Sequence, residues 1–475
     1  MKRTSLIPLG LLLLLAALAL IPAGTAPTSG LPVNGGDVAW MLTATALVML
    51  MTPGLAFFYG GMVSLKNVVS TMLQSFIALG VVSLLWVVVG FSLAFGPSIH
   101  GLIGNPFTYF MFRGVGALPD PRLAPTIPLL LFALFQLKFA IITPALITGA
   151  FAERIRFSAY LLFISLFSLF IYAPLAHWTW NPDGFLHTMG VLDFAGGTVV
   201  HMSAGFAALI GALMLGRRRS HANDETHEPA NVPLIMLGTG LLWFGWFGFN
   251  AGSALAASTT AVLAFGTTNT AAAAAMLSWL AVDVLRGRKP SAIGACVGAV
   301  VGLVAITPAA GYVTISSSIL IGLLASVTCN YAVHFKSKST LDDALDVFPC
   351  HGVGGMVGMV ATGIFATQGG LITGHWTLFL HHLLALVIVA AFTSAGSYVL
   401  YKVTDAIIPL RVEHEDEELG LDLAQHGESA VAPAGPKVVR AASWPRVVRE
   451  AAQAALGMEP GGELEVEAEY QLTAK

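Results

Sequence analysis

The sequence predicts an all-α integral membrane protein with eleven transmembrane helices, from its composition, its long apolar segments and the placement of its basic residues. Of the 475 residues, 56% are hydrophobic and only 10% are charged, and the mean hydropathy is +0.78. Soluble domains carry about 25% charged residues, so this composition excludes a soluble fold for most of the chain. The formal net charge of −3 at pH 7 argues against nucleic acid as a partner.

The N-terminus has the pattern of a secretory signal peptide. Lys2 and Arg3 precede an apolar stretch from Leu6 to Ile21 and a small-residue segment that ends at Ala26. We therefore expect residues 1–26 to be a signal peptide, with an uncleaved anchor helix as the alternative. In either case the next segment is expected to start outside the cytoplasm.

Eleven apolar segments follow, most of them near the roughly 20 residues that a spanning helix needs. We expect them to form a transmembrane domain over residues 38–404. The predicted spans are Val38–Phe58, Val68–Phe95, Leu129–Phe151, Phe157–Ala176, Thr198–Leu215, Val232–Asn250, Thr259–Leu285, Ala292–Ile306, Tyr312–Phe335, Val347–Ala366 and Leu378–Thr404.

Basic residues lie in every second loop between these segments. Cytoplasmic loops carry an excess of Lys and Arg, so this alternation predicts an outside N-terminus and a cytoplasmic C-terminus in the cell (cytoplasmic) membrane. The alternate loops hold only Arg113 and Arg122. The basic loops, the end of the last span and the chain just after it hold Lys66, Arg154, Arg156, Arg217, Arg218, Arg219, Arg286, Arg288, Lys289, Lys336, Lys338, Lys402 and Arg411.

The spans can be divided into a first set of five and a second set of five. Because five is odd, the two sets would run through the membrane in opposite senses, which predicts a five-plus-five inverted repeat. Inverted repeats place a substrate path at their interface near the membrane midplane. His201 and His351 lie early in the fifth and tenth spans, the last helix of each half, and each follows an aspartate, Asp193 or Asp346. The two histidines therefore occupy matching places.

Ionisable residues in membrane spans usually face the bundle interior or a wet path, so we interpret the two histidines as functional rather than as packing residues. A bis-histidine haem is the main chemical alternative, but that class needs further ligands or a binding signature. The sequence contains neither. A metal site would also need a third ligand, and the adjoining Cys350 would point about 100° away from His351 on a helix. We expect no cofactor and no bound metal.

Aromatic residues are the second group that could be functional. The default reading of Trp178 and Trp180, just outside the fourth span, is an interfacial belt. Phenylalanines such as Phe139 and Phe249 by default pack in the bundle or contact lipid. An aromatic face near Ser253 would also suit a cation. The residues alone leave these readings open.

Several long motifs occur in order along the chain: TPGLAFFYGGMVSLKNV, GAFAERIRFSA, DFAGGTVVHMSAG, GWFGFNAGSA and DVFPCHGVGG. Together they resemble the ammonium transporter family (Amt, related to the Mep and Rh proteins). The resemblance runs from about Trp40 to the start of the polar tail. Trp180, the serine of the FNAGS motif (Ser253) and the polar tail fit the bacterial Amt branch better than the Rh branch.

The resemblance implies an ammonium transporter that is not an enzyme. Trp180, Phe139 and Ser253 match the family's outer recruitment site, which holds an ammonium ion by aromatic faces and a hydroxyl acceptor. Asp193 matches a buried acid near that site, and on its own sequence position it would also serve as a helix N-cap.

The resemblance also assigns a gate and a pore. Phe139 and Phe249 match the stacked gate below the recruitment site. His201 and His351 match twin histidines that share a hydrogen bond and line a narrow hydrophobic pore. A dry pore excludes K⁺ and Na⁺ because a bare ion would lose its hydration there, whereas ammonium can release a proton and cross as NH₃. We expect electrogenic uptake; the alternatives are a neutral NH₃ or CO₂ channel of the Rh kind, or an ammonium sensor that signals through the tail.

Lys138 departs from the expected pattern, because a small or apolar residue is expected beside Phe139. A cation at the gate would repel ammonium. We expect the Lys138 side chain to point off the pore, to pair with an acid or to extend toward the membrane surface.

The polar end of the chain divides in two. Residues 405–430 resemble the family's cytoplasmic regulatory region, which implies bracing between subunits of a homotrimer and a response to a PII-type signal protein. Residues 431–475 lie beyond the resemblance. They are expected to be partly disordered, with a short amphipathic helix from about Ser443 as the alternative.

Overall fold

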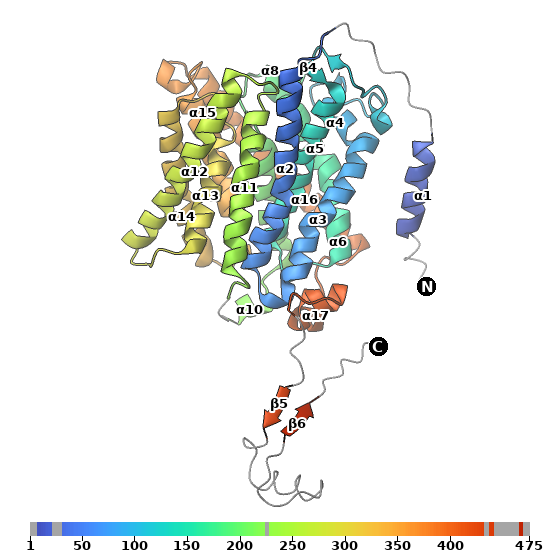
Figure 1. Ribbon diagram of the computed structural model, residues 1–475, viewed down its shortest axis with the longest axis vertical. Helices are drawn as coiled ribbons and strands as arrows, with labels where there is room; N and C mark the ends of the chain where they lie inside the picture. Colours follow the sequence, from blue (N-terminus) through green and yellow to red (C-terminus); the bar gives the residue numbers. More distant parts are fainter. Residues whose placement is uncertain (1–6, 21–30, 224–227, 432–436, 441–464, 469–475) are drawn as a thin grey trace, which may run out of the picture. The chain divides into compact units, whose positions relative to one another are not determined.

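All eleven apolar segments are helical in the computed structural model, which describes residues 7–20, 31–223, 228–431, 437–440 and 465–468 (Figure 1). The chain forms two compact units, Met1–Glu428 and Ser429–Lys475. The first unit contains the helical bundle. Its N-terminal helix α1 (Ile7–Ala19) lies within the predicted signal peptide.

Most bundle helices begin and end within a few residues of the predicted bounds. Four of the helical segments include a short π-helical turn: η3 (Trp86–Gly90), η6 (Ser168–Tyr172), η7 (Gly197–Met202) before α9 and η8 (Phe348–Val353) before α15. The helices are α2 (Gly35–Met62), α3 (Val68–Leu85), α4 (Phe91–Phe95), α5 (Leu129–Ile147), α6 (Phe157–Phe167), α7 (Ala173–Trp180), α9 (Ser203–Leu215), α11 (Val232–Gly252), α12 (Thr259–Leu285), α13 (Ala292–Ile306), α14 (Ile315–Ser337), α15 (Gly354–Phe365) and α16 (Thr377–Ile407).

Ten helical segments of the described chain are long and apolar enough to cross a membrane, so this is a multi-pass membrane protein. The eighth predicted span is the exception. Helix α13 has 15 residues, which at 1.5 Å per residue covers less than the roughly 30 Å of a hydrocarbon core. Most of its residues are buried, so the helix is enclosed by protein rather than by lipid.

Side-chain caps explain where several helices start. A helix leaves its first N–H groups unpaired, and an Asn, Ser or Thr at the preceding position can accept from one of them. This arrangement begins five of the bundle helices, with the caps Asn34, Asn231, Ser258, Ser291 and Thr314.

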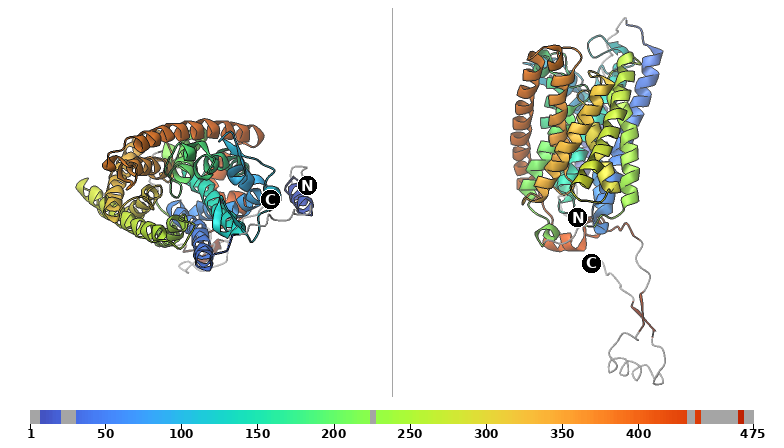
Figure 2. Two further views of the ribbon diagram at one scale, coloured as in Figure 1. Left: turned by 90° about the horizontal axis from the view of Figure 1, so that it is seen from above. Right: turned by 90° about the vertical axis from the view of Figure 1, so that its left-hand side faces the viewer.

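Helices α2 and α11 make the most extensive contact in the bundle. Glycines allow it, because a Cβ at Gly238 would overlap the backbone of Phe58. Small residues at such crossings let membrane helices approach closely. The last helix, α16, lies along one side of the bundle in both views of Figure 2 and contacts α6, α9 and α15.

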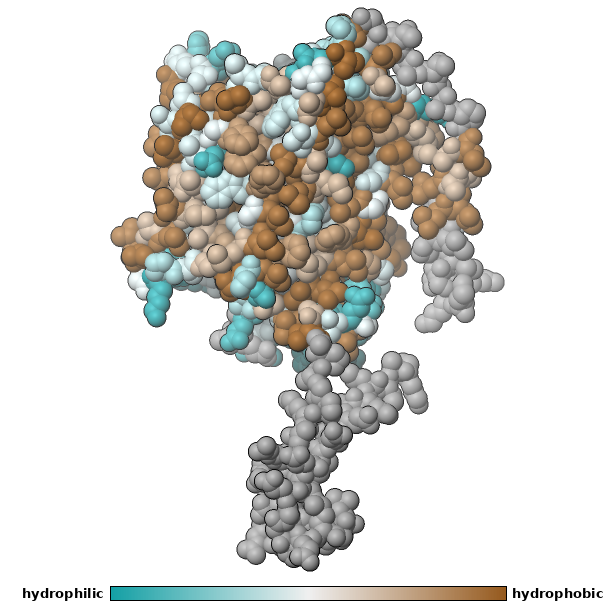
Figure 3. Space-filling model, viewed as in Figure 1, coloured by the Kyte–Doolittle hydropathy of each residue, from teal (hydrophilic) through white to brown (hydrophobic). Residues whose placement is uncertain are grey.

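The side of the bundle is apolar and its ends are more polar. Brown residues dominate the visible side in Figure 3, with teal residues mostly near the edges. We call the end that carries α8 (Phe185–Thr188) and β4 (Ala124–Pro128) the upper end (Figure 1). It also holds the short elements β1 (Ser98–Ile99), β2 (Ile103–Gly104), η4 (Phe110–Phe112), β3 (Pro119–Asp120) and η9 (Leu371–Thr373).

The opposite, lower end carries α10 (Arg219–Ala222) and α17 (His414–Leu419), with η2 (Leu65–Asn67), η5 (Thr148–Ala150) and η10 (Asp422–His426). Here the segment after α16 is held against the loops. Lys66 Nζ donates to the carbonyl oxygens of Glu417 and Glu418 at 3.2 and 2.7 Å, and the Asp422 carboxylate accepts from the N–H groups of Val69 and Ser70.

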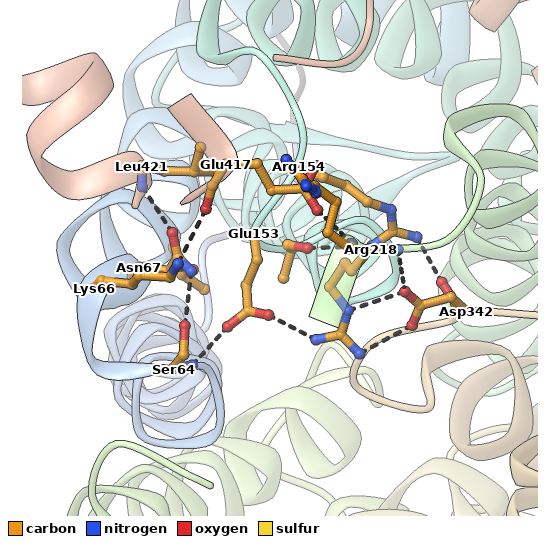
Figure 4. Close-up of polar contacts among 12 residues, drawn as sticks. Ser64, Lys66, Asn67, Glu153, Arg154, Arg218, Asp342, Glu417 and Leu421 are labelled. Atoms are coloured by element: carbon orange, nitrogen blue, oxygen red, sulfur yellow. Dashed lines mark hydrogen bonds and ion pairs between the residues drawn. The ribbon is translucent and has the colours of Figure 1, made fainter. Parts of the chain in front are cut away.

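A buried ionic network joins three loops at this end (Figure 4). Arg218 Nη1 lies 2.7 Å from Glu153 Oε2, and Arg218 Nη2 lies 2.9 Å from Asp342 Oδ1. Beside it, the fully buried Arg154 donates only to backbone carbonyls, including that of Asp342. Burial disfavours the charged forms of both Arg218 and Asp342. Even so, the Arg218 guanidinium holds the pKa of Asp342 well below its usual value, and Asp342 with Glu153 raises the pKa of Arg218.

The second unit contains a pair of short antiparallel strands, β5 (Lys437–Arg440) and β6 (Glu465–Ala468), with Lys437 opposite Ala468. The helix considered from Ser443 lies outside the described residues.

Replacing Arg218 by Met tests the buried network. The change leaves Glu153 and Asp342 as uncompensated buried carboxylates, so we expect a loss of about 3–5 kcal/mol and a clearly lower melting temperature in detergent. Arg122→Met is the matched control. Its exposed pair with Asp183 contributes about 1 kcal/mol or less, and equal melting temperatures for the two variants would refute the prediction.

Candidate functional site

A cavity of about 450 Å³ opens at the upper end of the bundle. All four residues predicted for the recruitment site, Phe139, Trp180, Asp193 and Ser253, line it. They come from four places in the chain: α5, the end of α7, the segment before α9 and the end of α11. The structure therefore brings together residues that are up to 114 positions apart in sequence (139 to 253).

The aromatic rings form a continuous series from this cavity into the bundle. The Phe139 ring centroid lies 5.7 Å from that of Trp180 and 4.2 Å from that of Phe249. Phe249 is 6.1 Å from His201, and His201 is 5.5 Å from His351. The last four rings are almost completely buried, so the series leads from an open cavity into the closed centre of the bundle.

Asp193 joins the cavity to the helix that carries His201. Its carboxylate accepts from the N–H groups of Gly196, Gly197 and Thr198 at 2.6 to 2.8 Å, and so caps the π-helical turn η7 (Gly197–Met202). Its carbonyl oxygen accepts from Trp180 Nε1 at 3.0 Å. The N-cap position itself is Gly196, so Asp193 binds the first N–H groups of the turn from three residues upstream, and its carbonyl also holds the indole of Trp180.

Both histidines lie in π-helical turns, His201 in η7 and His351 in η8. Such turns are rare and are frequent at functional sites. Helix α9, which continues from η7, crosses η8 closely because Gly205 has no side chain. A Cβ at Gly205 would overlap the backbone of Gly352. This approach leaves His351 Nδ1 3.4 Å from His201 Nδ1.

The hydrogen bonds of Thr307 assign the tautomers of His201 and His351 when both imidazoles are neutral. Thr307 donates its one hydroxyl proton to the carbonyl oxygen of Leu303 and accepts from Trp246 Nε1. His201 Nε2, 3.3 Å from the same hydroxyl oxygen, must therefore donate to it. Nδ1 of His201 is then the acceptor for the Nδ1–H of His351, and Nε2 of His351 is left as an acceptor.

The aspartate that corresponds to Asp193 is Asp343, and the pairing of Asp193 with Asp346 is wrong. Asp343 stands eight residues before His351, as Asp193 stands eight before His201. Its buried carboxylate accepts from the N–H groups of Val347 and Phe348 at 3.0 and 2.7 Å. Burial raises the pKa of Asp343 to about 6. Asp346, with a left-handed φ of 58°, pairs instead with Lys336.

A second, apolar cavity of about 180 Å³ lies beyond the histidine pair, lined by residues that include Tyr59, Val300, Asp346, Cys350 and His351. His351 thus borders a cavity on the side away from the aromatic rings.

Three residues of this region carried no usable sequence signal. Trp246 stacks on His201 at 5.4 Å and looks in sequence like an ordinary span residue. Thr307, which fixes the tautomer of His201, stands one residue past a predicted span. His382 accepts from the N–H of Leu192 and contacts the carbonyl oxygen of Met359 through Nδ1, which holds the segment before Asp193.

Lys138 is half-buried and is not among the residues that line the 450 Å³ cavity. Adjacent residues of a helix point about 100° apart, so its side chain leaves α5 in a different direction from Phe139. This placement agrees with the expectation that Lys138 points off the path.

Replacing His382 by Phe tests its structural role. The change leaves the Leu192 N–H and the Met359 carbonyl without their partner, at about 1–3 kcal/mol each, so we expect a lower melting temperature. His382→Gln, which keeps an acceptor, should lose less. His381→Phe on the same helix is the control, and a loss as large as that of His382→Phe would contradict the assignment.

Comparison with known proteins agrees with this geometry. The profile of the Ammonium Transporter Family matches residues 39–431. Ammonium transporters of Aquifex aeolicus and Bacillus subtilis are 48% identical over 402 residues and 46% identical over 403 residues. Each alignment covers 83% of this chain, and 93% and 98% of the two relatives.

Solved structures give the same result. Saccharomyces cerevisiae Mep2 has a TM-score of 0.78 at 36% identity, over 84% of this chain and 93% of that chain. A structure described as a sensor Amt protein has a TM-score of 0.76 at 31% identity, over 82% and 98%. By profile, identity and coverage, the chain belongs to the ammonium transporter family.

Proposed function

We propose that this protein moves ammonium across the cytoplasmic membrane by separating the ion into NH₃ and a proton. NH₄⁺ binds in the upper cavity and is deprotonated there. NH₃ then passes Phe139, Phe249 and the two histidines, while the proton takes a separate route, so that uptake is electrogenic. The observation that carries the proposal is the unbroken series of rings from Trp180 to His351.

The upper cavity has the chemistry that a small cation needs. Ammonium loses hydration when it leaves water, and aromatic faces replace part of that interaction through their quadrupole. Trp180 and Phe139 supply two such faces. The Ser253 hydroxyl donates its proton to the carbonyl oxygen of Phe249 at 2.8 Å, so its oxygen offers only lone pairs, which suit an N–H donor.

The buried ring pair accounts for selectivity against metal ions. Phe139 and Phe249 offer no oxygen ligands, so K⁺ or Na⁺ would lose its hydration without compensation. NH₃ is neutral and small, and it can both donate and accept hydrogen bonds. The acceptor nitrogen assigned to His351 gives such a molecule a partner at the exit of the buried section.

Two alternatives remain to be distinguished from electrogenic transport. The sensor Amt structure raises signalling as the first, and ammonium uptake by the purified protein alone would favour transport. A neutral NH₃ or CO₂ path of the Rh kind does not call for a cation site, and the pairing of Trp180 with Ser253 argues against it.

The proposal also covers the division of the chain into segments, its orientation in the membrane and its assembly. We assign residues 1–26 to a signal peptide, 38–404 to eleven spans in a five-plus-five inverted repeat, 405–430 to a cytoplasmic regulatory region and 431–475 to an extra tail. The upper end faces outside. The equal spacing from Asp193 to His201 and from Asp343 to His351 supports the repeat. A homotrimer and a PII-type partner at the lower end are the assembly that the family suggests.

An ammonium pulse applied to proteoliposomes tests the charge movement. Wild type should give an inward current, and His201→Leu or His351→Leu should reduce ammonium uptake about 10-fold or more, because each leaves a buried nitrogen without its partner. Phe247→Leu is the control, since Phe247 stacks on Phe265 away from the ring series. Uptake by an electrically silent wild type would refute the electrogenic mechanism.

Lys138→Ala tests the placement of the lysine. With the side chain off the path, ammonium uptake and its dependence on ammonium concentration should stay unchanged. A lysine facing the path would repel the ion, so a faster uptake after its removal would show that the placement is wrong.

A further inference from the structure

Two polar side chains in the wall of the upper cavity have no assigned role. Gln136 and Thr179 are 8% and 3% exposed, and both line the 450 Å³ cavity. Gln136 Oε1 and Thr179 Oγ1 are buried, and neither has a hydrogen-bond partner within the part of the chain that the structure describes.

Unpaired oxygens of this kind are costly and therefore informative. Leaving a buried acceptor unpaired costs about 1–3 kcal/mol, and most buried polar atoms in proteins have a partner. The two oxygens stand in one cavity that is large enough for a small ligand or for water. A hydrogen-bond donor that enters the cavity would satisfy them.

The position of the two residues points to the cation as that donor. Gln136 precedes Phe139 by three residues on α5, so the two side chains share one face of the helix. Thr179 directly precedes Trp180 at the end of α7. The helices that supply the aromatic faces thus also supply the two oxygens, and Ser253 adds a third from α11.

We propose that Gln136 and Thr179 accept hydrogen bonds from the bound ammonium ion and complete, with Ser253, a site of three oxygens beside the aromatic faces. This rests on the proposed function, because it names further binding residues of the same site. The ion carries four N–H donors, so three acceptors can be engaged together. Cation–π attraction alone does not depend on the number of N–H groups, whereas three oxygen acceptors favour a cation with at least three. Dimethylammonium, which has two, should therefore bind poorly.

The test measures ammonium accumulation in proteoliposomes and its inhibition by dimethylammonium. Gln136→Met keeps the length of the side chain and removes the amide. We expect its KM for ammonium to rise about 10-fold or more at unchanged kcat, as for a lost hydrogen bond to a charged group, and discrimination against dimethylammonium to shrink. Thr179→Val should likewise raise the KM for ammonium and reduce the discrimination against dimethylammonium.

Gln74→Met is the matched control. Gln74 on α3 is also buried with an unpaired amide, but it does not line the cavity, so its KM and discrimination should match wild type. A KM for Gln136→Met equal to that of wild type would mean that the oxygen binds only water, and it would overturn the assignment while transport itself persists.

Gln136→Glu keeps the inference testable if the Met variant does not fold. It retains an acceptor oxygen and adds negative charge, so KM should fall below the wild-type value. A folded Glu variant with an unchanged or higher KM overturns the assignment. A wild-type protein that accumulates no ammonium would overturn the transport proposal and this inference together. Unchanged KM in the Gln136 variants of a transporting protein would overturn this inference alone.

Discussion

The contact between His201 and His351 depends on how closely two backbones can approach. Gly205 allows the two segments to touch, because a Cβ there would overlap the backbone of Gly352, the residue after His351. Asp193 and Asp343 then fix where each π-helical turn begins by binding its first N–H groups. The ring geometry is thus set by backbone contacts, and the imidazoles follow.

The same arrangement explains why so many polar groups can lie inside an apolar bundle. Membrane interiors offer no water to an unpaired group, and the polar groups that hold the His201 segment are bonded within the protein: Thr307 to Trp246 and Leu303, and Asp193 to three N–H groups. The exceptions in the upper cavity, Gln136 and Thr179, stand where a substrate would enter.

Apolar length was enough to predict the helices, and motif order named residues that the structure brings together in the upper cavity and the ring series. The eight-residue spacing from Asp343 to His351 was present in the sequence but was obscured by the nearer Asp346. Thr307 and His382 could not be found in this way, because their roles arise from contacts across 106 and 190 positions of the chain. The short helix α13 resembled a full span because an enclosed helix and a lipid-facing helix are equally apolar.

The ionic network at the lower end has a mechanical consequence. Glu153, Arg218 and Asp342 come from loops that follow α5, α9 and α14, which lie far apart in the sequence. Tilting these helices against one another would separate charges that are shielded from solvent. In the proposed transport, this frame would oppose the rocking motion that many carriers use, and passage would then depend on small rotations of individual rings such as Phe139 and Phe249.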